Sequence, residues 1–311
     1  MSFTLALEAL RVAGVPFEIR KGAPSIEELP PDGEVDLWIE PADLSVADMA
    51  LRSVGFVPVS APGQGAHRFY LELEQGRWRK LDLKLRGVRQ RRGTARKLIA
   101  RRPLSMHRTG PVIALVGPDG AGKGTMVAEL LRRIPVGVTA VYLGGRRRSA
   151  GARAEPSRGS RVAAGPRELA FVLRKWLRPL STLARAYPAA WRGHIVVCDR
   201  HPLEVLATTP DRSARAAALE RFLATRLTPR PDAVVVLDAP AEVLIARKPE
   251  HSLGTLEALR ASYREVFGPM GATFVDTRMP LESTVGRVSE AVWSALMVRR
   301  GERVIGPGRR P

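Results

Sequence analysis

Short aliphatic runs that alternate with helical stretches place the strongest limit on how this 311-residue chain folds. From residue 111 onward, helical patterns separate the runs VIALVG, VTAVYLG, HIVVCD, DAVVVLD and TFVDT. Strands that are apolar on both faces and separated by helices are typical of a parallel sheet with helices on both sides. The pattern predicts an α/β domain over residues 111–299, followed by a flexible tail at 300–311.

Residues 1–85 show a different pattern, in which two helical stretches accompany four strand-like ones. Apolar residues have helical spacing in FTLALEALRVAG and LSVADMALRSVGF, whereas VPFEIRKG, EVDLWIE, HRFYLELE and WRKLDLKL have the character of strands. This combination predicts a small α+β domain.

Residues 86–110 join the two predicted domains and contain nine Arg or Lys residues but no acid. We interpret them as a basic linker with a short helix near TARKLIARR. Binding of RNA, DNA or anionic lipid is the alternative for such a segment. A solvated connector is favoured because no aromatic residues interleave for stacking on bases.

The formal net charge of +19 is compatible with a polyanionic partner. However, 43 Arg against 7 Lys in a chain rich in Ala, Gly and Pro is also typical of a G+C-rich genome, so local motifs must decide. The single cysteine, Cys198, excludes an internal disulfide, and its apolar run HIVVC predicts a small buried hydrophobe. The N-terminal stretch carries Glu8 and Arg11 inside its apolar pattern, unlike a signal peptide, and no run reaches roughly 18 uncharged apolar residues, so we expect a cytoplasmic protein without a membrane partner. A homodimer is an open alternative.

The segment VIALVGPDGAGKGT carries the clearest functional motif. Gly117 to Lys123 fit the phosphate-loop spacing G-x-x-x-x-G-K between a predicted strand and a predicted helix. Glycines let successive N–H groups turn toward phosphate oxygens, the helix N-terminus adds positive potential, and Lys123 adds a full charge. The expected ATP contacts are Gly117, Pro118, Asp119, Gly120, Ala121, Gly122, Lys123, Gly124 and Thr125.

One position departs from the general motif, because Gly124 stands where Ser or Thr usually follows the lysine to hold Mg²⁺. Thr125 comes one residue later, and GKGT resembles the variant found in adenylate-kinase-like enzymes. Thr125 is therefore our candidate metal ligand, although which hydroxyl contacts the ion stays open.

The phosphate loop and four further motifs together resemble the thymidylate-kinase-like family of nucleoside-monophosphate kinases. The matching stretches are GPDGAGKGT, HIVVCDRHP, PDAVVVLDAPAEVLIARKPEH, YREVF and FVDT, and the resemblance covers residues 111–299. It implies an α/β P-loop kinase fold that uses ATP and Mg²⁺.

The resemblance also implies roles for individual residues. Lys123 and the loop amides would hold ATP, and Asp119 would accept a hydrogen bond from a sugar hydroxyl of the acceptor. Arg200 would bind the acceptor phosphate or the moving phosphoryl group, and Asp199 would lie near Mg²⁺. Arg247, with the lysine that follows it, would close over the reaction and neutralise developing charge.

Simpler interpretations stay open for three of these residues: a structural ion pair for Arg200, and a solvated helix end for Arg247 and Lys248. The REP-like turn of thymidylate kinases is also missing. In its place is a basic, glycine-rich insertion at 144–165, which is either an acceptor-binding loop or a disordered segment without a role in binding.

The predicted reaction is transfer of the γ-phosphoryl group of ATP to a nucleoside monophosphate, with dTMP as the first acceptor to consider. A second possibility is a kinase acting on a sugar, nucleoside or glycan hydroxyl, with Asp119 or Asp199 as general base. A third is a nucleotide-binding regulator that attaches to nucleic acid through the basic linker.

The N-terminal region resembles nucleotidyltransferases of the polymerase-β type. Gly22 and Ala23 are followed by ten residues and then by Glu34 and Asp36, and KLDLKL offers Asp82 as a third carboxylate. Alternate residues of a strand project to one face, so these acids are candidates for an Mg²⁺ site. Ala23 and Glu34 depart from the family pattern, and a degenerate domain kept for binding is the alternative to an active one.

Overall fold

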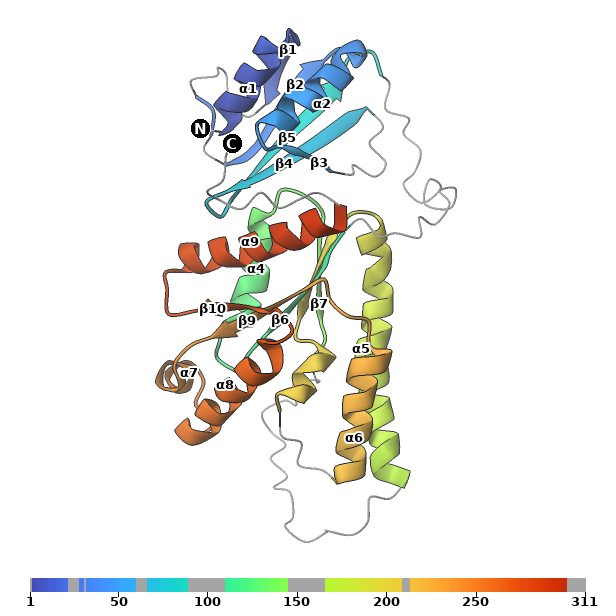
Figure 1. Ribbon diagram of the computed structural model, residues 1–311, viewed down its shortest axis with the longest axis vertical. Helices are drawn as coiled ribbons and strands as arrows, with labels where there is room; N and C mark the ends of the chain where they lie inside the picture. Colours follow the sequence, from blue (N-terminus) through green and yellow to red (C-terminus); the bar gives the residue numbers. More distant parts are fainter. Residues whose placement is uncertain are drawn as a thin grey trace.

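The computed structural model describes residues 2–21, 28–30, 32–59, 66–88, 110–144, 166–208 and 213–300. Two five-stranded sheets organise this part of the chain (Figure 1). Three predictions fall outside the described residues: the linker helix near 94–102, the Gly22-Ala23 pair, and the tail from 301. All but the first residue of the 144–165 insertion lies outside them as well.

The first sheet has the strand order β1-β2-β5-β4-β3. Strands β2 and β5 are parallel, and the other described pairs are antiparallel. The elements of this region are α1 (Ser2–Val12), β1 (Phe17–Lys21), β2 (Gly33–Ile39), η1 (Pro41–Asp43), α2 (Leu44–Ser53), β3 (Val57–Val59), β4 (His67–Glu74) and β5 (Arg77–Leu85).

Alternation along β2 and β5 separates an apolar face from a charged face. The apolar side chains, among them Val35, Leu37 and Leu83, share a buried core with α1 and α2. Their neighbours in sequence, including Asp36 and Asp82, therefore project from the opposite face. The register places Asp36 directly opposite Asp82.

The second sheet is entirely parallel, with the order β10-β9-β6-β8-β7. Its strands are β6 (Val112–Val116), β7 (Val138–Tyr142), β8 (Ile195–Asp199), β9 (Ala233–Asp238) and β10 (Thr273–Asp276). The connecting elements are α4 (Lys123–Arg133), α5 (Pro166–Trp191), η2 (Pro202–Leu206), α6 (Ala214–Phe222), η3 (Leu223–Leu227), α7 (Ala241–Arg247), α8 (Leu253–Phe267) and α9 (Leu281–Arg300).

Helices cover both faces of this sheet, as the aliphatic strands require. Residues of α4 and α9 pack on one face, where Leu115 is fully buried. On the other face, α8 packs against Val116, and α5 packs against Cys198. Burial raises the pKa of the Cys198 thiol to about 12, so this cysteine is a neutral core side chain, as expected.

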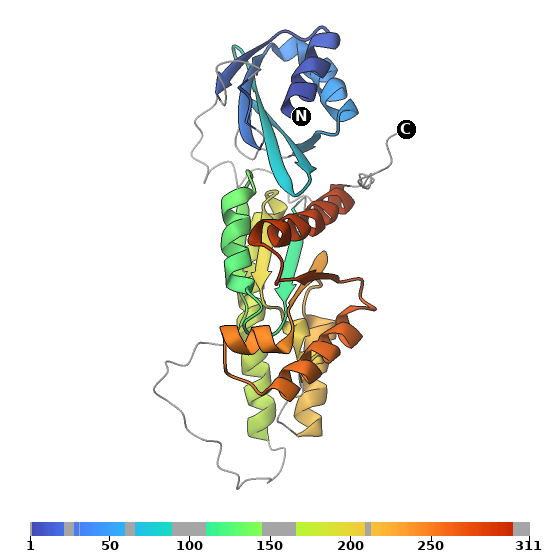
Figure 2. The same ribbon diagram turned by 90° about the vertical axis from the view of Figure 1, so that its left-hand side faces the viewer.

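The turn between β4 and β5 contacts α9 and joins the two sheet regions (Figure 2). Gly76, at φ +75°, approaches Gly286 so closely that a Cβ on Gly76 would lie 2.4 Å from the Gly286 Cα. Beside this crossing, the rings of Trp78 and Trp293 meet edge to face at 5.7 Å. Leu71 and Trp78 belong to the same buried cluster as the α9 side chains.

The predicted strands agree with the structure to within a few residues, and the parallel sheet is confirmed. One detail differs. The prediction omitted β3, whose sequence VPV contains a proline, which edge strands tolerate. No helix in the described ranges has the length and apolar character needed to cross a membrane.

Candidate functional site

The loop between β6 and α4 turns sharply, and glycines make this turn possible. Gly117, Gly120 and Gly122 have φ values of +141°, +87° and +85°. A Cβ on Gly117 would lie 2.2 Å from the Leu237 carbonyl oxygen, and one on Gly120 would lie 2.9 Å from that of Leu244. The loop therefore keeps its path only without side chains at these two positions.

The N-terminus of α4 is open. Gly122 is the N-cap residue and supplies no side-chain cap, so the first amides of the helix keep their capacity to donate to an anion. A Cβ on Gly122 or Gly124 would meet nothing within 4 Å. Thr125 follows on the exposed side of the first turn. This part of the loop has room for a ligand, unlike the tightly packed Gly117 and Gly120.

Lys123 folds back across the loop. Its side chain is only 7% exposed, and Nζ donates hydrogen bonds to the carbonyl oxygens of Gly117 at 2.6 Å and Pro118 at 2.9 Å. Burial lowers the pKa of Lys123, and the carboxylates of Glu204 and Asp119 act against that shift. The ammonium group is thus held at the mouth of the loop by neutral acceptors.

Asp119 gathers three cations around the loop. Its carboxylate accepts a hydrogen bond from Arg200, and it lies 3.5 Å from Lys248 Nζ and 3.9 Å from Lys123 Nζ. Burial raises the pKa of Asp119, but the adjacent Arg200, Lys123 and Lys248 charges outweigh it, so the net direction is downward. Asp119 is therefore ionised at neutral pH and organises the surrounding positive charge.

Asp199 and Arg200 occupy the carboxyl end of β8, next to β6. Arg200 has a φ of +72°, a left-handed conformation that non-glycine residues rarely adopt and that is often found at functional sites. Burial raises the pKa of Asp199, whereas Lys123 and Arg200 lower it, and the net direction is upward. Within the described residues, no side chain donates a hydrogen bond to the Asp199 carboxylate.

Glu204 is a functional candidate that the sequence analysis missed. Its Oε1 accepts hydrogen bonds from the Gly117 amide at 3.2 Å and the Tyr263 hydroxyl at 3.0 Å, and its Oε2 lies 3.9 Å from Arg200. Burial raises the pKa of Glu204, although Lys123 and Arg200 act in the opposite direction. The only signal in the sequence was its place four residues after Arg200 in DRHPLE.

The structure brings Lys248, rather than Arg247, to Asp119. The Arg247 guanidinium donates to the Thr277 hydroxyl at 3.0 Å and to the Thr277 carbonyl at 2.8 Å, beyond the end of β10. Lys248 also lies 3.0 Å from Glu250. Of the two predicted closing cations, Lys248 is thus the one placed at the phosphate loop.

The three predicted acids of the N-terminal region converge. Ligand oxygens of Glu34, Asp36 and Asp82 all lie within 4.8 Å of one another. Asp36 is 7% exposed, and its Oδ1 is a buried atom without a hydrogen-bond partner. Burial first, and then Glu34 and Asp82, raise the pKa of Asp36. Three clustered carboxylates, one of them buried and with an unpartnered oxygen, are a donor set that suits a hard divalent cation.

Each of these acids also has a basic or histidine neighbour. Lys80 Nζ lies 2.7 Å from Glu34, Arg20 lies 3.5 Å from Asp36, and His67 Nδ1 lies 2.8 Å from both Asp82 oxygens. A bound cation would have to compete with these three contacts. The three acids are suitable ligands for a metal ion, but each already has a contact with a basic or histidine side chain.

The location of the phosphate loop in the sheet agrees with a ligand site. The chain passes from β6 to β7 across the position of β8, and it later continues on the other side of β6 with β9. In open α/β sheets, ligands bind at the carboxyl ends of the strands where the strand order reverses in this way. Lys123, Asp119, Asp199 and Arg200 all gather at that edge.

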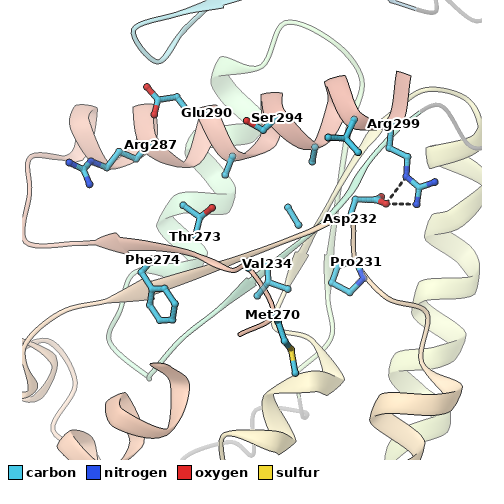
Figure 3. Close-up of a pocket in the computed structure, with 15 residues that line it drawn as sticks. Pro231, Asp232, Val234, Met270, Thr273, Phe274, Arg287, Glu290, Ser294 and Arg299 are labelled. Atoms are coloured by element: carbon cyan, nitrogen blue, oxygen red, sulfur yellow. Dashed lines mark hydrogen bonds and ion pairs between the residues drawn. The ribbon is translucent and has the colours of Figure 1, made fainter. Parts of the chain in front are cut away.

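A groove of about 920 Å³ lies at the opposite, amino-terminal end of β9 and β10, under α9 (Figure 3). Val234, Phe274 and Arg287 are among its lining residues, and Arg299 forms an ion pair with Asp232 at one end. None of the predicted site residues lines it. The groove is separate from the phosphate loop.

Comparison with known proteins leaves the family open. No protein-family model and no curated protein sequence matches the chain. Among solved structures, the thymidylate kinase from Ehrlichia chaffeensis matches over 60% of this chain and 98% of its own, at 16% identity and a TM-score of 0.36. The five-stranded parallel sheet with its surrounding helices is compatible with a P-loop kinase fold.

Proposed function

We propose that residues 111–299 form an ATP-dependent phosphotransferase that moves the γ-phosphoryl group of ATP to a nucleoside monophosphate, with dTMP as the first acceptor to test. The observation that carries the proposal is the convergence of Lys123, Asp119, Arg200 and Lys248 at a glycine-lined loop at the sheet's switch point. Phosphoryl transfer needs positioned positive charge and little covalent chemistry from the protein, which matches this set.

The donor side of the site would be the loop and Lys123. The open amides at the start of α4 would bind phosphate oxygens. Lys123 Nζ would exchange the neutral carbonyls of Gly117 and Pro118 for charged phosphate oxygens, which are stronger acceptors. Because the ammonium already lies at the loop, this exchange needs only a small movement of the side chain.

Thr125 and Asp199 are the residues that would hold Mg²⁺. Asp199 suits this role because it is a half-buried carboxylate at the sheet edge to which no described side chain donates. When bound, Mg²⁺ would neutralise charge on the β- and γ-phosphates. Asp199 would also orient the ion's water ligands by accepting their hydrogen bonds.

The acceptor side would be built on Asp119 and Arg200. Asp119, fixed by Arg200 and Lys248, would accept a hydrogen bond from an acceptor hydroxyl, and Arg200 would contact the acceptor phosphate or the moving phosphoryl group. Lys248 would supply the closing charge from the α7–α8 connection. Arg247 would join it only after leaving Thr277.

The test is a screen with radiolabelled ATP and Mg²⁺ against nucleoside monophosphates, nucleosides and sugars. Labelled product from dTMP or another monophosphate supports the proposal, and product from a sugar or nucleoside alone assigns the hydroxyl kinase instead. Saturable ATP binding without transfer, together with salt-sensitive nucleic-acid binding, would indicate the regulator. Lys123→Ala should abolish transfer, whereas Lys175→Ala on α5 should not.

A second activity is proposed for the N-terminal region: Mg²⁺-dependent nucleotidyl transfer at Glu34, Asp36 and Asp82. The buried, unpartnered Asp36 Oδ1 supports this proposal over a purely solvated acidic edge. The test is incorporation of α-labelled nucleotide with and without Mg²⁺. A cluster that neither binds Mg²⁺ nor transfers nucleotide would identify a degenerate domain.

A further inference from the structure

The α5–α6 hairpin concentrates unpaired positive charge to a degree found nowhere else in the described α/β domain. Residues 166–192 and 213–230 contain nine Arg and one Lys but only two acids. Both acids have partners within the hairpin, since Glu220 pairs with Lys175 and Glu168 accepts from Ser213. No described acid pairs with the arginines, which are Arg167, Arg174, Arg178, Arg185, Arg192, Arg215, Arg221, Arg226 and Arg230.

A genome rich in arginine codons does not explain this distribution. On the other elements of the domain, most arginines have acidic partners, as in the pairs Arg133–Glu282, Arg260–Asp238 and Arg278–Asp276. If composition alone placed the arginines, paired and unpaired ones would be mixed along the chain. Instead, most of the arginines without an acidic partner lie on one hairpin.

Four of these arginines form a row along α5. Arg167, Arg174, Arg178 and Arg185 have spacings of seven, four and seven residues. On an ideal helix they lie within about 20° of a common line and span about 27 Å. All four are exposed. Pro179 lies inside α5 between Arg178 and Arg185, so the row follows the course of the helix at that point. A row of this length presents its charges to an extended anionic surface and not to a single small ligand.

Large apolar side chains are also exposed on the hairpin. Phe171 is 56% exposed, Leu177 is 55% exposed and Phe222 on α6 is 53% exposed, and Leu173 and Leu227 are exposed as well. Nucleic-acid phosphates make no favourable apolar contact with leucine side chains. A bilayer surface suits both groups, because apolar side chains enter the boundary beneath the headgroups while arginines bind lipid phosphates.

The hairpin is also placed where a flat surface can reach it. Helix α5 packs along β7 and β8 at one edge of the sheet, and with α6 it extends past the carboxyl ends of the strands (Figures 1 and 2). A second copy of the chain docked with its two-fold axis through the row is a poor occupant, since such an interface would set the arginines against their own charge. The lack of a spanning helix concerns crossing a bilayer and not binding to its surface.

We propose that the exposed face of the α5–α6 hairpin docks on the surface of membranes that contain anionic phospholipids. The arginine row attracts the phosphates, and Leu173 and Leu177, which lie on one side of the row, enter the headgroup boundary. The proposal is independent of the reaction catalysed at the phosphate loop. It departs from our expectation from the sequence that the protein has no membrane partner.

The test is cosedimentation of the full-length protein with vesicles of phosphatidylcholine alone or of equimolar phosphatidylcholine and phosphatidylglycerol. Binding is expected only to the anionic vesicles, and it should weaken as salt is raised. Each arginine near such a surface is worth about fivefold in affinity, so Arg174→Gln with Arg178→Gln should weaken binding about 30-fold. The matched control, Arg132→Gln with Arg287→Gln, makes the same charge change on α4 and α9 and should have little effect.

The apolar contribution is tested with Leu173→Ser and Leu177→Ser together, which should weaken binding about tenfold at high salt. Thermal unfolding of each variant checks that the fold is kept. The proposal is overturned if wild-type protein ignores anionic vesicles, or if the control pair weakens binding as much as the α5 pair. It is also overturned if single-stranded oligonucleotides bind more tightly through the same arginines. Sedimentation that shows a dimer lost in the Leu→Ser variant, with no vesicle binding, would instead identify a self-association surface.

Discussion

Glu204 offers the sharpest test of how the phosphate loop is held. Its carboxylate connects three elements: the Gly117 amide at the start of the loop, Tyr263 on α8 and Arg200 at the end of β8. We expect Glu204 to position both the loop and Arg200 without contacting substrate. Two substitutions separate these roles, because Gln keeps an acceptor oxygen and loses the charge, whereas Ala loses both.

The magnitude for Glu204→Ala follows from the bonds it removes. The Gly117 N–H and the Tyr263 O–H would both lose their acceptor, and each buried unsatisfied donor costs about 1–3 kcal/mol. The free energy of unfolding should therefore fall by about 2–6 kcal/mol. ATP binding should weaken too, because Gly117 begins the loop.

Glu204→Gln should affect transfer more than binding. The Gly117 and Tyr263 bonds persist with a neutral acceptor, so ATP affinity should stay close to wild type. Arg200 keeps Asp119 but loses its second carboxylate partner, and misplacement of a catalytic group by about 1 Å costs on the order of 100-fold in rate. We therefore expect a fall in kcat of about 10- to 100-fold, with little change in the KM for ATP.

The pH dependence gives an independent readout. Burial raises the pKa of Glu204 above its ordinary value of 4.5, so the native state binds this proton more tightly than the unfolded state does. Wild-type stability should then decrease as pH rises above 4.5 toward the native pKa. Glu204→Gln has no carboxyl group to titrate, so its free energy of unfolding should not show this decrease. The difference in stability between Glu204→Gln and wild type should therefore shift in favour of the variant as pH rises above 4.5.

The assays are urea unfolding between acid and neutral pH, calorimetry with ATP·Mg²⁺ and steady-state transfer to the acceptor that the screen identifies. Glu290→Gln, the same chemical change at an exposed position on α9, is the matched control and should resemble wild type. If Glu204→Gln transfers phosphate as fast as wild type and Glu204→Ala binds ATP equally well, Glu204 does not position the site. If the wild-type protein does not bind ATP, the kinase proposal itself is refuted.

Two further predictions concern the loop and the N-terminal acids. Gly117→Ala should lower both stability and ATP affinity, because its Cβ would lie 2.2 Å from the Leu237 carbonyl oxygen, whereas Gly124→Ala meets nothing within 4 Å and should keep both in thermal unfolding and calorimetry. Wild-type-like ATP affinity in Gly117→Ala would contradict the packing argument. Asp36→Asn should abolish Mg²⁺-dependent nucleotidyl transfer and leave phosphoryl transfer intact; loss of both activities would show a shared site. The native pKa of Asp36 is raised above 3.8, so the free energy of unfolding of wild type decreases as pH rises above 3.8. Asp36→Asn should therefore be more stable than wild type at neutral pH, whereas the control Asp43→Asn should not be.

Local patterns in the sequence were sufficient to predict most of the strands and the phosphate loop. Aliphatic runs such as VIALVG can be buried on both faces only in a covered parallel sheet, so five strands followed from their composition. Gly117, Gly120 and Lys123 were recognisable because the loop's backbone requirements lie within seven consecutive residues. Asp36 and Asp82 could be suggested as partners because alternation places each on one face of its strand, although their pairing in register came from the structure.

Other features depend on contacts between distant parts of the chain, and the tertiary structure alone decided them. Glu204 reaches the Gly117 amide across 87 residues, and Lys248 rather than Arg247 turns toward Asp119 because α7 ends just before it. The same holds for Lys80, Arg20 and His67, which oppose the N-terminal acids. Backbone preferences depend on a few neighbouring residues and can therefore be predicted from the local sequence. The partner of a long charged side chain depends instead on how whole elements pack together.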